Sequence, residues 1–264
     1  MAREVARAQG NSGAEDLISE LDAFASAYSG HLRQARTKSE HAVNLAQQGA
    51  QLERAALFET GAALREAYFG NAPAAKRTAM SALNLSNDRD VEYGAAFALT
   101  LSGNSSQTQT LAADLEWRFP EDTSVRFSYV PALRALLALQ HGAPAKAVEL
   151  LRTSAPYELG TPQSSFFGSY GTLYPIYVRG EAYLAAHQGA EAAAEFQKIL
   201  DHRGIVICDP IGALARLQLG RAYSLLGDKT KARDAYQDFL TLWKDADSDI
   251  PILKEAKTEY AKLQ

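Results

Sequence analysis

Residues 217 to 240, LQLGRAYSLLGDKTKARDAYQDFL, decide the fold. Apolar residues recur at helical spacing on both sides of the central turn: Leu217, Leu219, Ala222, Tyr223 and Leu226, then Ala232, Ala235, Tyr236 and Phe239. Gly227 supplies a backbone conformation that ends a helix, and Asp228 can cap the next one. The stretch therefore predicts two antiparallel amphipathic helices joined by a short turn.

The Gly-Asp-Lys-Thr in this turn also invites comparison with a phosphate-binding loop. That loop needs a lysine directly after its second glycine, and Asp228 separates Gly227 from Lys229 here. Gly220 and Gly227 are too far apart for the motif, and no strand-like run precedes them. An aspartate would also repel a phosphate, so the stretch does not predict nucleotide binding.

The same skeleton occurs a second time upstream. Residues 180 to 200, GEAYLAAHQGAEAAAEFQKIL, place Gly180, Tyr183, Ala192 and Phe196 forty positions before their counterparts Gly220, Tyr223, Ala232 and Tyr236. Weaker copies of the turn occur at Gly30, Gly70, Gly103 and Gly142. Such periodicity is typical of helical-repeat proteins.

The pattern resembles the tetratricopeptide repeat (TPR) family, which places Leu-Gly-x-x-Tyr on a first helix and an alanine and an aromatic residue on a second. The matching residues are Leu219, Gly220, Tyr223, Gly227, Ala232 and Tyr236. The resemblance implies an all-α fold: an α-solenoid, or right-handed αα superhelix, of about six TPR-like hairpins over residues 1–264. The best-matching repeats span 174–207 and 213–246, and 247–264 would be a C-terminal capping helix. Phe239, Lys244 and Arg179 depart from the family pattern.

Composition agrees with a soluble helical domain. The chain has 264 residues, 47% of them hydrophobic, with net charge −4, so no basic surface predicts nucleic-acid binding. No apolar run is long enough to cross a membrane, and we expect no direct membrane insertion. The single cysteine, Cys208, predicts a buried, inert thiol.

Motifs for catalysis, metals and cofactors are absent from the sequence. The five histidines form no H-E-x-x-H pattern, and no G-x-S-x-G or G-x-G-x-x-G element follows a strand-like run. We expect no catalytic residues, no metal and no cofactor, and therefore no enzyme.

TPR proteins usually bind a peptide or helix on the concave surface made by the first helices of their hairpins. The resemblance transfers this role to a set of inward positions: Tyr93, Phe97, Tyr129, Tyr174, Tyr177, Glu181 and Arg221. The sequence predicts a protein or peptide in this concave groove. A second interpretation is that the same rings only pack hairpin against hairpin. The Lys-Asn-Arg clamp with which some family members grip chaperone C-termini is not reproduced.

Residues 157–175 interrupt the repeat pattern with Gly, Ser, Pro and aromatic residues. The segment is too long for an ordinary connection between helices. The aromatic residues Phe166, Phe167 and Tyr170 either tuck the loop against the hairpins or contact a partner. Two alternative functions involve this segment. It could help to form a homodimer, or a small-molecule pocket could lie under residues 157–180.

Nearly the whole chain, from SGHLRQAR to the terminal KTEYAKLQ, resembles the C-terminal repeat region of bacterial eukaryotic-like serine/threonine kinases of the acidobacterial type. The kinase signatures themselves are absent. The resemblance implies a non-catalytic docking or sensory region of a longer signalling protein, and Met1 is expected to be a cut point. Similar repeats also follow winged-helix regulators. The domain would be cytoplasmic, or extracytoplasmic if attached to a membrane-spanning kinase.

Overall fold

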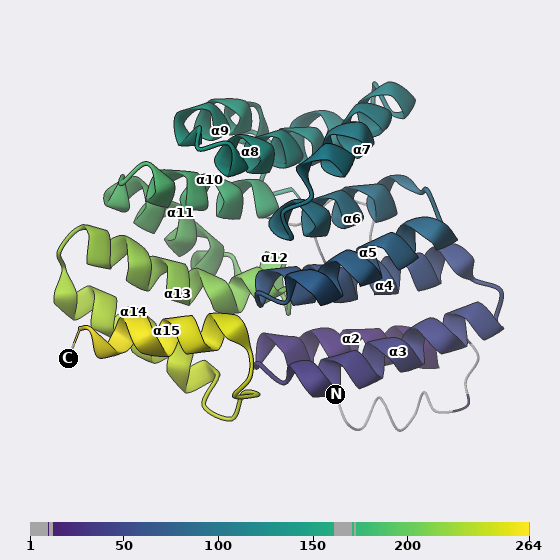
Figure 1. Ribbon diagram of the computed structural model, residues 1–264, viewed down its shortest axis with the longest axis horizontal. Coiled ribbons are helices and arrows are strands. Elements are labelled where there is room, and N and C mark those ends of the chain that lie inside the picture. The colour runs from purple at the N-terminus through teal and green to yellow at the C-terminus, as the bar shows by residue number, and fades with distance from the viewer. Residues whose placement is uncertain (1–9, 11–12, 161–170, 172, 264) are drawn as a thin grey trace.

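The computed structural model describes residues 10, 13–160, 171 and 173–263, and in these residues it is all-helical, without a strand (Figure 1). The α-helices are α2 (Glu15–Tyr28), α3 (Leu32–Gln48), α4 (Leu52–Tyr68), α5 (Ala72–Leu85), α6 (Arg89–Leu101), α7 (Ser105–Arg118), α8 (Val130–Gln140), α9 (Pro144–Leu150), α10 (Tyr174–Ala185), α11 (Gly189–Asp201), α12 (Arg203–Val206), α13 (Pro210–Leu225), α14 (Lys229–Leu242) and α15 (Pro251–Ala261). One turn of π-helix, Val125–Tyr129, leads into α8, and a 3₁₀ turn, Leu151–Ser154, follows α9. The all-α prediction is confirmed.

Consecutive helices pack as antiparallel pairs. The pairs are α2 with α3, α4 with α5, α6 with α7, α8 with α9, α10 with α11, and α13 with α14. The last helix, α15, packs against α14, where the sequence predicts a capping helix over 247–264.

The turn inside each pair is tight, and its middle residue has a positive φ. Five of these residues are glycines, as the repeat pattern indicates: Gly30, Gly70, Gly103, Gly142 and Gly227. In the α10–α11 turn His187 takes the position, with φ 58°. A left-handed residue here ends the first helix, and its own amide and the next one donate back to the last carbonyls of that helix. Gly30 N donates to Ala27 O at 2.8 Å, and His31 N donates to Ser26 O at 2.9 Å. After Gly227 the side chain of Asp228 accepts from Lys231 N, so the predicted stop and cap are both confirmed.

The repeated glycine inside the first helix has a packing role. A Cβ at Gly220 would lie 2.8 Å from the ring of Tyr236, and one at Gly180 would lie 2.6 Å from the ring of Phe196. The aromatic residue of each second helix therefore packs directly on the backbone of the first. This contact explains why the glycine and the aromatic residue recur together.

The sixth pair begins differently from the prediction. The sequence places its repeat at 213, whereas α13 begins at Pro210. Asp209 is the reason, because its side chain accepts from Ile211 N at 3.0 Å and caps the helix ahead of a proline at the first position. The short helix α12 fills the connection from α11.

The two ends of the described chain meet. Trp243 Nε1, after α14, donates to Tyr28 O at the end of α2, and Asp247 N donates to Gly30 O, both at 3.0 Å. The indole also packs against Phe69 at the end of α4, with ring centroids 4.9 Å apart. Figure 1 shows the yellow C-terminal elements beside the purple N-terminal pair.

These contacts close the helical pairs into a ring whose first helices face inward, and α13 packs against both α2 and α4. The right-handed superhelix of the TPR family stays a prediction.

None of the described helices is long and apolar enough to span a membrane.

Candidate functional site

The five predicted aromatic positions lie in the centre of the ring and are buried: Tyr93, Phe97, Tyr129, Tyr174 and Tyr177. They pack on one another rather than on an open groove. Tyr93 stacks on Tyr129 with centroids 3.8 Å apart, and Phe97 lies 4.7 Å from Tyr174. The expectation of an accessible concave surface is therefore not met at these rings, because ring closure brings opposite first helices together.

Tyr68 on α4 is a member of this cluster that sequence reasoning missed. Its ring makes edge contacts with Tyr174 and Tyr177, at 5.6 and 5.5 Å between centroids. Because α4 and α10 belong to pairs far apart in the sequence, no spacing rule connects these residues. The contact depends on the ring closure.

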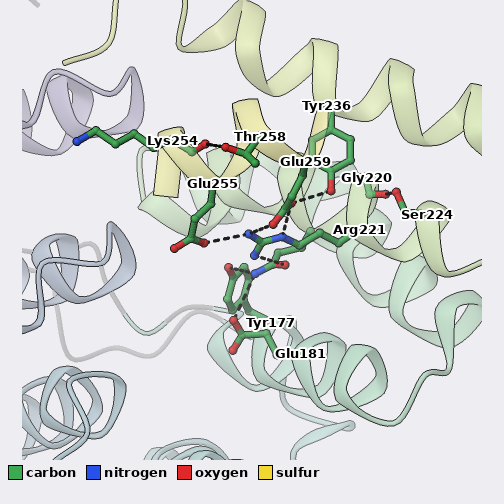
Figure 2. A network of polar contacts seen from close by, with 11 residues as sticks. Tyr177, Glu181, Gly220, Arg221, Ser224, Tyr236, Lys254, Glu255, Thr258 and Glu259 are labelled. Atoms are coloured by element: carbon green, nitrogen blue, oxygen red, sulfur yellow. Dashed lines mark hydrogen bonds and ion pairs between the residues drawn. The ribbon is translucent and has the colours of Figure 1, made fainter. Parts of the chain in front are cut away.

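The predicted polar positions, in contrast, form one network at the edge of the ring (Figure 2). Gln218 on α13 donates to the hydroxyl of Tyr177 at 3.0 Å and to Glu181 Oε1 at 3.4 Å, both on α10. Arg221 Nη1 donates to Gln218 Oε1 at 3.3 Å. The structure thus brings Tyr177, Glu181 and Arg221 together through a glutamine that the sequence analysis did not single out.

The remaining donors of Arg221 hold the C-terminal helix. Arg221 Nε and Nη2 each donate to one oxygen of Glu259 at 2.9 Å, and Nη2 also reaches Glu255 at 3.3 Å. The hydroxyl of Tyr236 donates to Glu259 at 2.8 Å. A bidentate guanidinium–carboxylate pair of this kind is among the stronger polar contacts in proteins. Figure 2 shows both glutamates on α15 pointing toward Arg221.

The acids in this network differ in their titration. Burial disfavours the charged form of Glu259, but the hydrogen bonds and charge of Arg221 outweigh it and hold the pKa below its usual value. Burial raises the pKa of Glu181 to about 7, and the charge of Arg221 offsets only part of that effect. Arg221 is therefore matched to Glu259, while Glu181 can be neutral near pH 7.

A second buried acid lies within the tyrosine cluster. Asp209 caps α13 with one oxygen, and its other oxygen has no hydrogen-bond partner in the described part of the chain. The hydroxyls of Tyr68, Tyr93 and Tyr174 also lack partners there. Burial raises the pKa of Asp209 to about 7, although the hydrogen bond from the Ile211 amide favours its charged form. The Asp-Pro dipeptide, a helix-start signal, is the clue by which the sequence could have revealed this residue.

The neighbouring thiol fits the sequence interpretation in part. Cys208 is half-buried rather than fully enclosed, and burial together with the nearby Asp209 raises the pKa of its thiol. A raised pKa disfavours the reactive thiolate.

The departure from the family pattern at Arg179 has a structural role. Its guanidinium donates to Glu158 at 2.9 Å and to Glu195 at 2.6 Å, and Lys198 also pairs with Glu158. These bonds fix the beginning of the predicted aromatic segment against α10 and α11. Phe166, Phe167 and Tyr170 lie outside the described residues, so both interpretations of that segment stay open.

A groove on the outside of the ring is separate from the predicted site. It has a volume of about 590 Å³, and α3, α4 and α5 line it with mostly polar side chains that include Arg36, Glu59 and Arg77. None of the predicted site residues lines it. The second helices α3 and α5 and the first helix α4 all contribute to its walls.

No protein-family model matches the chain, and a search of curated proteins found no match to it. Among the described residues, no cluster of three or more histidine, cysteine, aspartate or glutamate side chains could hold a metal ion.

Proposed function

We propose that this chain is a non-catalytic protein-interaction module, an α-solenoid of TPR-like hairpins that docks a helical segment of a partner at the edge of α10 and α13. One observation carries the proposal. Arg221, on an inward-facing helix, donates to both carboxylate oxygens of Glu259 on the amphipathic helix α15. A surface that holds one helix in this way has the chemistry to hold another.

The burial pattern supports this edge over the centre of the ring. The rings of Tyr93 and Tyr174 have no exposed area, so a partner cannot touch them while the ring is closed. Arg221 keeps 24% of its side chain exposed even with α15 in place. A partner can therefore approach Arg221 without any rearrangement of the core.

The sequence resemblance supplies the setting. We propose that the module is a docking or sensory region of a longer signalling protein, such as a serine/threonine kinase. Self-association and small-molecule sensing, the two alternatives from the sequence, stay predictions.

Affinity capture with charge-neutralised variants tests the docking surface. Arg221→Gln should lose captured proteins that the wild-type chain retains from a lysate of the source cells. Arg77→Gln is the matched control, because it neutralises an arginine in the outer groove instead. Thermal melting by circular dichroism should show that both variants are folded. Loss of partners with Arg77→Gln alone would move the binding surface to the outer groove and contradict the proposal.

A further inference from the structure

We infer that the centre of the helical ring contains a binding site for a small ammonium group, built by Tyr68, Tyr93, Tyr174 and Asp209. The inference goes beyond the proposed docking function, because none of these residues belongs to the docking surface. The four side chains come from separate parts of the chain, namely α4, α6, α10 and the residue that caps α13. Closure of the helical ring brings them together.

Four buried oxygen atoms of this cluster have no hydrogen-bond partner among the residues that the structure describes. They are the hydroxyls of Tyr68, Tyr93 and Tyr174, and Asp209 Oδ2. Tyr93 and Tyr174 have no exposed area, Asp209 is 1% exposed and Tyr68 is 7% exposed. Buried polar atoms are rarely left unpaired in proteins. Four of them in one cluster therefore indicate an occupant that supplies hydrogen-bond donors.

The four groups lie close to one another. The aromatic ring of Tyr174 has its centroid 5.6 Å from that of Tyr68 and 6.5 Å from that of Tyr93. Burial raises the pKa of each of these three phenols well above its usual value, and the nearby charge of Asp209 adds to the effect in all three. The phenols therefore stay neutral, and all of them lie within electrostatic reach of the same carboxyl group.

The charges around the cluster favour a cation. The carboxyl groups of Asp209 and Glu181 both act on Tyr68. The basic group whose charge reaches Asp209 is Arg65, but Arg65 already donates to Glu20 at 2.9 Å. A buried carboxylate without a cation of its own is costly, and a bound cation removes that cost. Aromatic rings around the cation stabilise it further.

The unpartnered oxygens and the close packing determine which cation fits. An ammonium group presents several N–H donors on one small nitrogen, so it can donate to carboxylate and phenol oxygens together. A water molecule has two donors and no charge, and would leave the carboxylate uncompensated. The aromatic rings are in contact, with centroids 4.7 Å apart for Phe97 and Tyr174, which leaves no room for a methylated quaternary amine. The ligand is therefore ammonium itself or a primary amine as small as methylamine.

Thermal unfolding of the full chain tests the site with ammonium chloride as the probe. At pH 8, about 50 mM ammonium chloride should raise the Tm by about 2–4 °C over sodium chloride of equal ionic strength, as a dissociation constant of about 10 mM implies. Asp209→Asn should lose this rise, and Tyr174→Phe should reduce it. Tyr183→Phe is the matched control, because Tyr183 lies on the same helix, α10, outside the cluster. The rise should also shrink at pH 5, since the pKa of Asp209 is about 7 and the acid is then protonated.

Two further salts and one direct measurement decide between the possible occupants. Tetramethylammonium chloride and potassium chloride should give no rise over sodium chloride. Nuclear magnetic resonance with isotope-labelled ammonium should show a bound signal that exchanges slowly with water in the wild-type chain and is lost in Asp209→Asn.

Three results would overturn the inference. A rise that persists in Asp209→Asn, or that tetramethylammonium reproduces, would be a general salt effect. An equal rise with potassium that Asp209→Asn abolishes would make the occupant a metal cation. The absence of both the rise and the bound signal in the wild-type chain would leave water as the occupant. None of these results involves Arg221, so the docking surface stands or falls separately by affinity capture.

Discussion

Asp209→Asn should increase the free energy of unfolding, and the increase should be about 2–3 kcal/mol larger at pH 8 than at pH 5. Asp209 is buried, and one of its oxygens lacks a partner among the described residues. Asparagine is as good a helix cap as aspartate, so the cap on α13 should persist. The substitution thus removes a buried charge and keeps its structural role.

The pH dependence follows from the pKa of about 7 in the folded protein against an ordinary value of 3.8. Between these values the folded state holds a proton that the unfolded state has released. Stability of the wild-type chain therefore falls as the pH rises from about 4 to 7, by about 1.4 kcal/mol per unit, and levels off above 7. The Asp209→Asn variant should not show this pH-dependent loss of stability.

Urea denaturation of both proteins at pH 5 and pH 8 measures the effect. Glu181 and Glu92, whose pKa values burial also raises to about 7, titrate in both chains, so the comparison isolates Asp209. An equal difference between the two proteins at both pH values would show that Asp209 is already ionised at pH 5.

Trp243→Ala should destabilise the chain by about 4 kcal/mol, the range expected when a buried aromatic residue is truncated. Trp243 is almost completely buried and touches the ends of α2 and α4, both remote in the sequence, as well as its own helix α14. It donates to Tyr28 O and packs against Phe69 and Phe239. Its loss removes this packing and one of the hydrogen bonds of the ring closure.

Trp117→Ala is the matched control, since Trp117 is 80% exposed on α7. It should change stability by less than about 0.5 kcal/mol, as is usual at exposed positions. Guanidinium denaturation followed by circular dichroism measures both variants. Similar small losses in the two variants would mean that the indole of Trp243 does not hold the ends of the chain together.

The sequence predicted the helical pairs well because their determinants are local. The turn glycines must adopt positive φ, and the glycine of each first helix must allow close approach of an aromatic ring. Both requirements place glycine at fixed spacing in the sequence. The same local logic predicted the stop at Gly227 and the cap at Asp228.

The ring closure could not be predicted in this way. Trp243 and Tyr28 are 215 positions apart, and no repeat rule relates them. The departures at Phe239 and Lys244 flank Trp243, and Phe239 packs on it with centroids 4.7 Å apart. The departure from the TPR pattern around Trp243 was the one feature of the sequence that could have indicated this contact.

The candidate site was predicted in part. Tyr177, Glu181 and Arg221 do meet, because their positions on successive first helices follow from the repeat. The aromatic rings were assigned to an open surface because the sequence does not reveal how far the superhelix curves. Glu255 and Glu259 were missed because residues 247–264 were predicted only as a capping helix, with no site residue among them.

The distance between the first and last helical pairs tests the closed ring most directly. Spin labels at Arg33→Cys and Asp249→Cys, in a Cys208→Ser background, would replace an exposed ion pair of 3.0 Å that contributes little stability. Double electron–electron resonance should then give one short distance between the two labels, of about 20 Å or less. An open stack of six pairs, at about 10 Å for each packed helix, would instead separate the labels by about 50 Å. A dominant distance in that longer range would contradict the closed ring.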